Sequence, residues 1–231
     1  VTPFLPLSDP ANPLNGKTGR FKGSHTDYRI NVDYHWTDDL MTYVQFATGF
    51  KGGGISPRPY FPQQVRGFGP EELEAYELGM KSRWFDSRVQ ANIALFYNDY
   101  IGYQSTPVQC VDAAGNILPA PFDEPCGQYL NVADARVKGA EVELDIRPAE
   151  GLSIDAAYSY LDFTFGTPYI ATGSVIAGRS APGLGKNKWS TGLQYEFGLG
   201  GRGSLTPRVD VFYMPGYCGD LNCTPRSRNE S

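Results

Sequence analysis

Strict alternation of apolar and polar residues recurs along eight segments of this chain. In the segment 27–36, DYRINVDYHW, every second residue from Tyr28 to Trp36 is apolar or aromatic. Successive side chains of a β-strand point to opposite faces, so this period of two predicts a strand with one apolar and one polar face. The other alternating segments are 40–50, 74–85, 88–99, 136–147, 152–163, 188–197 and 204–213.

The lengths of these strands and of their connections limit the fold classes that the chain can adopt. The strands are about 10 to 12 residues long, whereas roughly 5–6 is typical of globular proteins and roughly 9–11 crosses a bilayer at a tilt. Short connections (37–39, 86–87, 148–151, 198–203) alternate with long ones (51–73, 100–135, 164–187 and all residues after 213). The pattern predicts an all-β fold: a segment of an antiparallel transmembrane β-barrel with about eight long strands, short periplasmic turns and long extracellular loops.

Aromatic residues mark both ends of the predicted apolar faces. Those beside the short turns are Trp36, Trp84 and Phe197, and those near the outer rim are Phe50, Tyr160 and Trp189. Outer-membrane barrels carry such aromatic girdles at both membrane interfaces. The opposite, polar faces then line a hydrated lumen.

Composition excludes several other classes of protein. A formal net charge of −5 provides no basic surface for nucleic acid. The longest uncharged stretch, 163–178, contains Pro168 and three glycines and cannot form a transmembrane helix. With two histidines in the chain, no Ser-His-Asp arrangement is credible, so we predict neither an enzyme nor a cofactor.

The four cysteines form two local pairs, Cys110 with Cys126 and Cys218 with Cys223, each in a polar stretch rich in proline and glycine. Local pairs in loops favour disulfides in an oxidising compartment. Metal ligation and free thiols are the alternatives. Neither histidine has ligand spacing from a cysteine, and we predict no metal site.

Four stretches resemble TonB-dependent outer-membrane receptors of the siderophore-receptor type. They are YVQFATGFKGGG (43–54), PEELEAYELGMKSRWFDSRVQANIALFYNDY (70–100), NVADARVKGAEVELDIRPAEGLSIDAAYSYLDFTF (131–165) and RSAPGLGKNKWSTGLQYEF (179–197). Together they extend over about residues 27–213 in the order of the family.

The resemblance implies a barrel of about 22 strands, closed by an N-terminal plug, that imports ferric siderophores or a similar scarce nutrient across the outer membrane of a Gram-negative bacterium. The implied partners are outer-membrane lipid, the ferric siderophore or similar small ligand, and the TonB complex, contacted through the plug region. Residues 1–231 are expected to be part of the C-terminal half of the barrel, without the plug, the TonB box and the final strands.

The loop 51–73 contains the candidate ligand-binding residues, which combine cations with aromatic rings. These are Arg58, Tyr60, Phe61, Arg66 and Phe68. Ferric siderophores are often anionic and carry aryl rings, so arginine supplies charge-assisted hydrogen bonds and the aromatic residues supply stacking. The alternative is an ordinary loop whose side chains pack on their neighbours.

Other charged residues fall on the two faces of the predicted strands. Arg136 and Lys138 lie on the outward face near the outer rim, where we predict contact with lipopolysaccharide phosphates; solvated charges are the alternative. The carboxylates Glu141, Glu143 and Asp145 are predicted to form a solvated stripe in the lumen rather than an acid–base pair or a calcium site. His35 is predicted to be hydrated there.

Two further fold hypotheses stay open on the sequence alone. A small, complete eight-stranded outer-membrane barrel with a structural or adhesive role fits the number of strands. A secreted β-sandwich binding module fits the aromatic residues and the cysteines, but not the strand length or the alternation of loop lengths.

Overall fold

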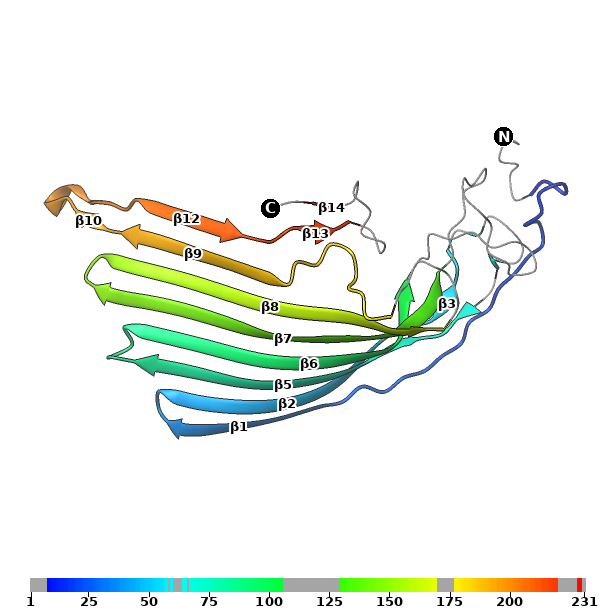
Figure 1. Cartoon of the computed structure of the whole chain (residues 1–231), viewed down its shortest axis with the longest axis horizontal. Helices are drawn as coiled ribbons and strands as arrows, with labels where there is room; N and C mark the ends of the chain where they lie inside the picture. Colours follow the sequence, from blue (N-terminus) through cyan, green and yellow to red (C-terminus); the bar gives the residue numbers. More distant parts are fainter. Residues whose placement is uncertain are drawn as a thin grey trace.

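Eight long strands form one antiparallel sheet in a computed structural model of the chain, which describes residues 8–57, 59, 64–65, 67–105, 129–169, 177–219 and 228–229. The strands are β1 (Arg29–Thr37), β2 (Leu40–Lys51), β5 (Glu71–Trp84), β6 (Val89–Ser105), β7 (Leu130–Ala149), β8 (Leu152–Pro168), β9 (Asn187–Tyr195) and β12 (Arg208–Tyr213). Each pairs with its neighbours in the chain, so the sheet is a curved meander (Figure 1). Among the described residues β1 and β12 each have one neighbour, and the sheet is therefore open.

Small hairpins accompany the sheet. They pair β3 (Gly54–Ile55) with β4 (Gly67–Phe68), β10 (Phe197–Gly198) with β11 (Ser204–Leu205), and β13 (Tyr217–Cys218) with β14 (Arg228–Asn229). The 3-10 turn η2 (Gly200–Arg202) lies between β10 and β11. No helix in the described part of the chain is long and apolar enough to cross a membrane.

Short turns gather at one end of the sheet and long connections at the other (Figure 1). Residues 38–39 join β1 to β2, residues 85–88 join β5 to β6, and residues 150–151 join β7 to β8. The predicted alternation of short and long connections is therefore confirmed. We call the two ends the turn end and the loop end.

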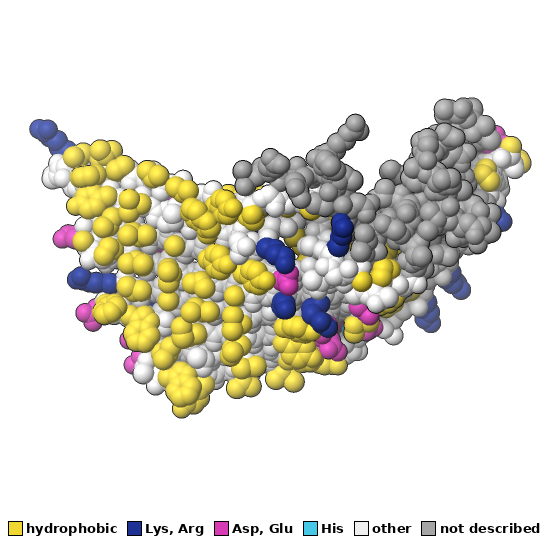
Figure 2. Space-filling model, viewed as in Figure 1, with side chains coloured by type: hydrophobic (Ala, Val, Ile, Leu, Met, Phe, Trp, Pro, Cys, Tyr) yellow, Lys and Arg dark blue, Asp and Glu magenta, His cyan; other side chains and the backbone are white. Residues whose placement is uncertain are grey.

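Apolar residues lie directly opposite one another on neighbouring strands. One row across the sheet consists of Val32, Val44, Leu78 and Leu95, and another of Val142, Tyr158, Trp189 and Tyr213. These side chains are not covered by protein: Val32 is 64% exposed and Leu78 is 51% exposed. Figure 2 shows apolar side chains spread over this outward face, which needs a non-aqueous environment.

Aromatic rings lie at both edges of the outward face. At the turn end Trp36 and Trp84 are exposed beside their turns. At the loop end three rings form a ladder across β2, β5 and β6: the ring centroids of Phe46 and Tyr76 are 5.0 Å apart, and those of Tyr76 and Tyr97 are 6.3 Å apart. Aromatic rings thus lie at both ends of the outward face, but the ladder at the loop end is formed by residues other than the expected Phe50, Tyr160 and Trp189.

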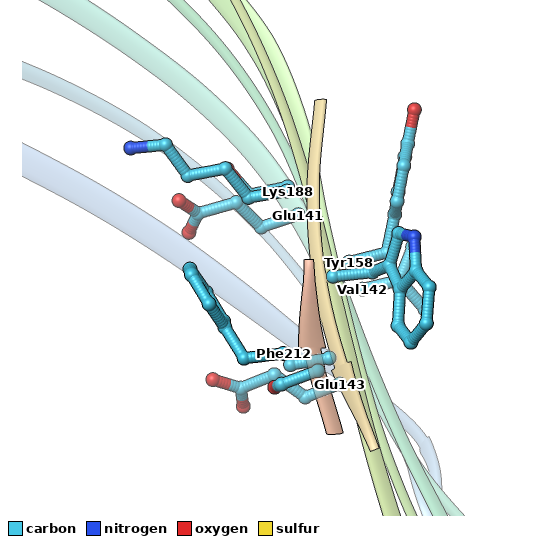
Figure 3. Close-up of a pocket in the computed structure, with 10 residues that line it drawn as sticks. Glu141, Val142, Glu143, Tyr158, Lys188 and Phe212 are labelled. Atoms are coloured by element: carbon cyan, nitrogen blue, oxygen red, sulfur yellow. The ribbon is translucent and has the colours of Figure 1, made fainter. Parts of the chain in front are cut away.

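The opposite face of the sheet is polar. Figure 3 shows Glu141, Glu143 and Lys188 projecting from one side of the sheet, with Val142 and Tyr158 on the other. The pocket in that view, with a volume of about 200 Å³, has lining residues from both sides and is a surface hollow rather than a ligand cavity.

Four strands extend clearly further at the loop end than the alternation predicts. β5 begins at Glu71, β6 continues to Ser105, β7 begins at Leu130 and β8 continues to Pro168, whereas the expected limits are 74, 99, 136 and 163. Gly102 has a φ of +67°, and the register shifts between Tyr100 and Tyr103. Such a β-bulge breaks the period of two while the backbone stays paired, so the sequence pattern ends before the strand does.

The last strand is shorter than predicted. β12 begins at Arg208 instead of residue 204, because residues 204–205 pair with residues 197–198 in the small hairpin. Pro207 then separates the two pairings; it has no backbone N–H to donate to a ladder.

The packed core of the described residues lies at the loop end, on the polar-face side of the extended strands. Its members are Val132, Ala133, Ala135, Val137, Phe163 and Phe165. The Tyr103 ring meets Phe163 and Phe165 edge-on at centroid distances of 5.6 and 5.4 Å. Ala181 and Leu184, from the connection that precedes β9, pack against this core.

Candidate functional site

The base of the loop between β2 and β5 is a close approach of two backbone segments. Gly54 pairs with Phe68, and Ile55 pairs with Gly67. A Cβ added at Gly53 would lie 2.4 Å from the Phe68 carbonyl oxygen, so only glycine fits there. Within the sequence KGGG, Gly53 therefore allows the two backbone segments to pack closely at the start of this loop.

Two amide side chains fasten this loop base to the neighbouring strands. Asn131 of β7 donates through Nδ2 to the carbonyl oxygens of Gly69, Pro70 and Gly102 (3.1, 3.0 and 2.6 Å), and its Oδ1 accepts from the Gly69 N–H at 2.7 Å. Gln104 of β6 is buried, and its Nε2 donates to three more carbonyls, those of Lys51, Gly52 and Gly69. We call Asn131 and Gln104 the amide clamp.

A cation and two aromatic rings lie beside the amide clamp. The rings of Phe68 and Tyr129 have centroids 5.3 Å apart, and the Lys51 Nζ lies 5.6 Å from the Tyr129 centroid. Lys51 also lies 3.6 Å from Glu71 Oε2, which accepts a hydrogen bond from the Gln104 N–H at 2.6 Å. This arrangement provides π-faces and an ammonium group, itself paired with Glu71, where two long connections begin and end.

The structure places one of the five predicted ligand-binding residues. Phe68 is half-buried in β4 and packs on Tyr129. The other four, Arg58, Tyr60, Phe61 and Arg66, lie outside the described residues, and their roles stay predictions.

Sequence reasoning missed Lys51, Tyr129 and the amide clamp. Gln104, Tyr129 and Asn131 fall in the stretch 100–135, which has no alternation and for which the sequence predicts one long connection. Their positions in the sequence could have indicated them, because they flank long connections. Residues that flank the long connections of adjacent strands lie at the same end of a sheet.

A group of charged side chains lies on the outward face at the loop end. We call Asp99, Arg136, Lys138, Asp162 and Lys186 the rim cluster. The Arg136 Nε lies 3.2 Å from Asp99 Oδ1, and the Lys186 Nζ lies 2.5 Å from Asp162 Oδ1. The hydrogen bond to Asp162 raises the pKa of Lys186 above its ordinary value, since the carboxylate stabilises the ammonium form. Strand register places Lys138 between Tyr97 and Asp162.

The carboxylates of the polar face have individual partners. Asn92 Nδ2 donates to Glu143 Oε2 at 3.3 Å, and Arg147 Nε lies 3.3 Å from Asp145 Oδ1. Within the described ranges no three His, Cys, Asp or Glu side chains are grouped to hold a metal ion. His35, with an exposed side chain, lies 3.6 Å from Asp33 Oδ2.

One of the four cysteines lies within the described residues. Cys218 of β13 is disulfide-bonded, which favours the disulfide hypothesis over metal ligation for this residue. Cys110, Cys126 and Cys223 lie outside the described residues, so both predicted pairings stay predictions.

Known proteins share this sequence pattern and fold. The family described as "TonB dependent receptor-like, beta-barrel" matches residues 7–228. The probable TonB-dependent siderophore receptor PiuA of Acinetobacter baumannii is 24% identical over 150 residues, which are 63% of this chain and 18% of that protein.

Solved structures of ferric siderophore receptors have a similar fold. The ferric yersiniabactin uptake receptor FyuA of Yersinia pestis has a TM-score of 0.66 at 20% identity, with 87% of this chain and 27% of that chain covered. The ferric preacinetobactin receptor BauA of Acinetobacter baumannii has a TM-score of 0.61 at 17% identity, with 85% and 26% covered. The chain thus spans about a fifth to a quarter of the length of these relatives. With nearly its whole length matched by the family, the chain belongs to the TonB-dependent receptor-like β-barrels.

Proposed function

We propose that this chain is part of the barrel wall of an outer-membrane receptor that imports ferric siderophores or a similar scarce nutrient. The observation that carries the proposal is the sheet itself. The side chains of its apolar face are exposed, and aromatic rings lie at both edges of that face. The long connections gather at one end of the sheet. Relatives named as ferric siderophore receptors share the fold and support the assignment.

In this proposal the two faces of the sheet have different surroundings. The apolar face contacts the lipid of the Gram-negative outer membrane, and the polar face lines the lumen. The turn end is periplasmic and the loop end extracellular. A plug region of the full-length receptor would connect it to the TonB complex.

We assign ligand capture to the loop whose base the amide clamp holds. Phe68 and Tyr129 offer rings for stacking on aryl groups, and Lys51 offers a positive charge near an anionic ligand. The predicted residues Arg58 and Arg66 belong to the same loop. Fixing the loop base lowers the entropy that is lost when the loop orders around a ligand.

The two other fold hypotheses account less well for the sheet. A β-sandwich buries the apolar face of each sheet against a second sheet, whereas here that face is exposed. A complete eight-stranded barrel requires β1 to pair with β12, and the described residues form no such pair.

The test is radio-iron uptake by the native full-length receptor in a strain that lacks its own copy. The probes are ferric catecholate, ferric hydroxamate and ferric phenolate siderophores, and a TonB-deficient strain measures the unenergised background. We expect energy-dependent uptake of at least one probe, and a loss of its binding in Arg58→Ala/Arg66→Ala. Arg202→Ala, at the turn end, is the matched control. Unchanged binding in the double variant would exclude the loop assignment; no uptake of any ferric probe would exclude iron import.

A further inference from the structure

The segment that precedes the first strand runs along the base of the loop between β2 and β5. We call residues 19–27 the strap. They continue the antiparallel course of β1 beside β2, past Phe50 and Gly53 to Ile55 (Figure 1). A Cβ added at Gly19 would lie 2.8 Å from Ile55 Cγ2, so the strap backbone contacts the Ile55 side chain directly. The strap therefore reaches the same loop base that the amide clamp holds.

Phe21 is the central contact of the strap. Its ring borders the position that a Cβ would take at Gly53, which is 2.6 Å from the ring carbons Cε2 and Cζ. A Cβ at Gly23 would also meet this ring, at 3.1 Å. Glycine at both positions thus leaves room for the ring. The Phe68 carbonyl borders the same position at Gly53, so Phe21 lies where β3 and β4 approach each other.

His25 provides a second contact, with β2 and β5. The imidazole stacks on Phe50 with ring centroids 4.6 Å apart and an interplanar angle of 25°. Its Nε2 lies 3.2 Å from Asp27 Oδ1, and its Nδ1 lies 3.8 Å from Glu72 Oε1. Contacts with one ring face and two carboxylates limit the imidazole to one orientation. His25 therefore fixes the position of the strap along β2.

The strap differs from the strands in how it is attached. In the described ranges residues 19–27 form no backbone–backbone hydrogen bond, and the pairing of β1 with β2 ends where the Thr48 N–H donates to the Tyr28 carbonyl at 2.9 Å. The residues of the strap are exposed, and Phe21 is 39% exposed. Segments with few buried contacts open at a small cost in free energy. The strap can therefore leave the loop base while the sheet stays intact.

We propose that the strap holds the loop between β2 and β5 in the conformation that captures ligand, with Phe21 and His25 as positioning residues. The inference rests on the proposed function, which assigns ligand capture to this loop. The amide clamp belongs to β6 and β7 and is the fixed support of the loop base, whereas the strap is the removable support. An attached strap orders the loop before a ligand arrives and so lowers the entropy lost on binding. A detached strap lowers the fraction of receptor that is competent to bind, and the apparent affinity falls by that fraction.

The first experiment is hydrogen exchange of the full-length receptor in detergent, without ligand. In Phe21→Ala, exchange at the amides of β3 and β4 should accelerate about fivefold, the scale of one aromatic contact, while exchange in β5–β8 stays unchanged. Phe85→Ala is the matched control, because it removes a phenyl ring that is 76% exposed at the turn end. Heat-modifiable electrophoretic mobility checks that each variant is folded.

The second experiment measures the affinity of the same receptors for the ferric catecholate, hydroxamate and phenolate probes. Phe21→Ala and His25→Ala should each weaken binding about fivefold, since each removes one ring contact of the strap. Phe21→Tyr keeps the ring and should bind as wild type does. The midpoint of guanidinium unfolding should not change in these variants, which separates a positioning role from a general loss of structure.

A covalent lock should produce the opposite change. Gly19→Cys/Ile55→Cys removes the Ile55 branches that a Cβ at residue 19 would meet, and it puts two thiols in adjacent positions. Its disulfide should restore the affinity of His25→Ala to the wild-type value, and reduction should abolish that gain. Wild type with the same reductant is the control, because Cys218 is itself disulfide-bonded.

The outcomes separate this inference from the proposed function. Equal affinity of wild type and Phe21→Ala for a bound ferric probe would overturn the positioning role alone, as would equal exchange at β3 and β4. A lock that leaves the affinity of His25→Ala unrestored would also overturn it. A wild-type receptor that binds none of the ferric probes refutes the proposed function; accelerated exchange in Phe21→Ala would then still support attachment of the strap to the loop base.

Discussion

On the outward face of the sheet, apolar side chains such as Leu78 and Leu95 are about half exposed, whereas in the core at the loop end Val132 and Phe163 are almost fully buried. Burial of such a side chain contributes roughly 1.5–3 kcal/mol when water is excluded from it. In the proposed placement lipid excludes water from the outward face, whereas in the core at the loop end the protein does so itself. One continuous sheet therefore has two sources of stability.

Truncation of a core ring should have the largest effect. Phe163→Ala removes a ring that is 5% exposed and contacts Tyr103 and Phe165, and it should lower the free energy of unfolding of the full-length receptor by about 3–5 kcal/mol. The loss should be equal in detergent and in lipid vesicles, as measured by guanidinium unfolding. Leu95→Ala is the comparison, and its loss should depend on the surrounding lipid. If the loss of unfolding free energy depended equally on lipid in Phe163→Ala and Leu95→Ala, the core and the outward face would not differ in their source of stability.

A charge in the middle of the outward face should have the next largest effect. Ile93→Arg faces lipid between Met80 and Val142, and should destabilise the receptor by about 2–4 kcal/mol in vesicles. Ala94→Arg, one residue along on the polar face and opposite Glu141, should cost far less because the guanidinium stays hydrated. Similar losses for the two variants would mean that the faces were assigned wrongly.

Loss of the amide clamp should act at the loop end alone. Asn131→Ala leaves three carbonyls and the Gly69 N–H without their partner, a loss of about 1–3 kcal/mol. Hydrogen exchange at the Gly69 amide should accelerate, while exchange in the turn-side strands stays unchanged. Asn98→Ala, on the polar face of β6, is the control. An equal acceleration of exchange at the Gly69 amide in Asn98→Ala would contradict the assignment.

A pH titration at the loop end should give the smallest effect. Partial burial and the hydrogen bond to the Asp134 carboxylate raise the pKa of the Tyr169 phenol above its usual 10.0. Because the folded-state pKa is the higher one, this contribution to stability is complete below pH 10 and is lost as the pH rises through the folded-state pKa. The pKa of Tyr169 is measured from the difference in ultraviolet phenolate absorbance between wild type and Tyr169→Phe as the pH is raised. Ionisation of Tyr169 at or below pH 10 would contradict the assignment.

The part of the sheet toward the turn end could be predicted from the sequence because residues close together in the chain determine its strands and hairpins. Alternation identified the strands and their faces, and short turns such as 38–39 limit each hairpin to one register that keeps the apolar faces together. Val32 opposite Val44 follows from that constraint alone.

The loop end could not be predicted in the same way. The bulge at Gly102 ends the alternation, although β6 continues to Ser105. The amide clamp joins Asn131 to Gly69 and Pro70 across a long stretch of chain, and an asparagine in a stretch without alternation carries no sign of such a partner. Of the candidate site, the loop was predicted and the side chains that fix its base were not.

The nearest-neighbour order of the strands also has a kinetic consequence. The two-residue turn 150–151 lets β7 and β8 meet at little entropic cost, whereas joining β6 to β7 must close residues 106–129, at an additional cost of about 2 kcal/mol. Hairpins closed at the turn end are therefore expected to form first and then to be added, one after another, to the growing edge. In such an assembly the hairpin, rather than the single strand, is the unit that enters the membrane.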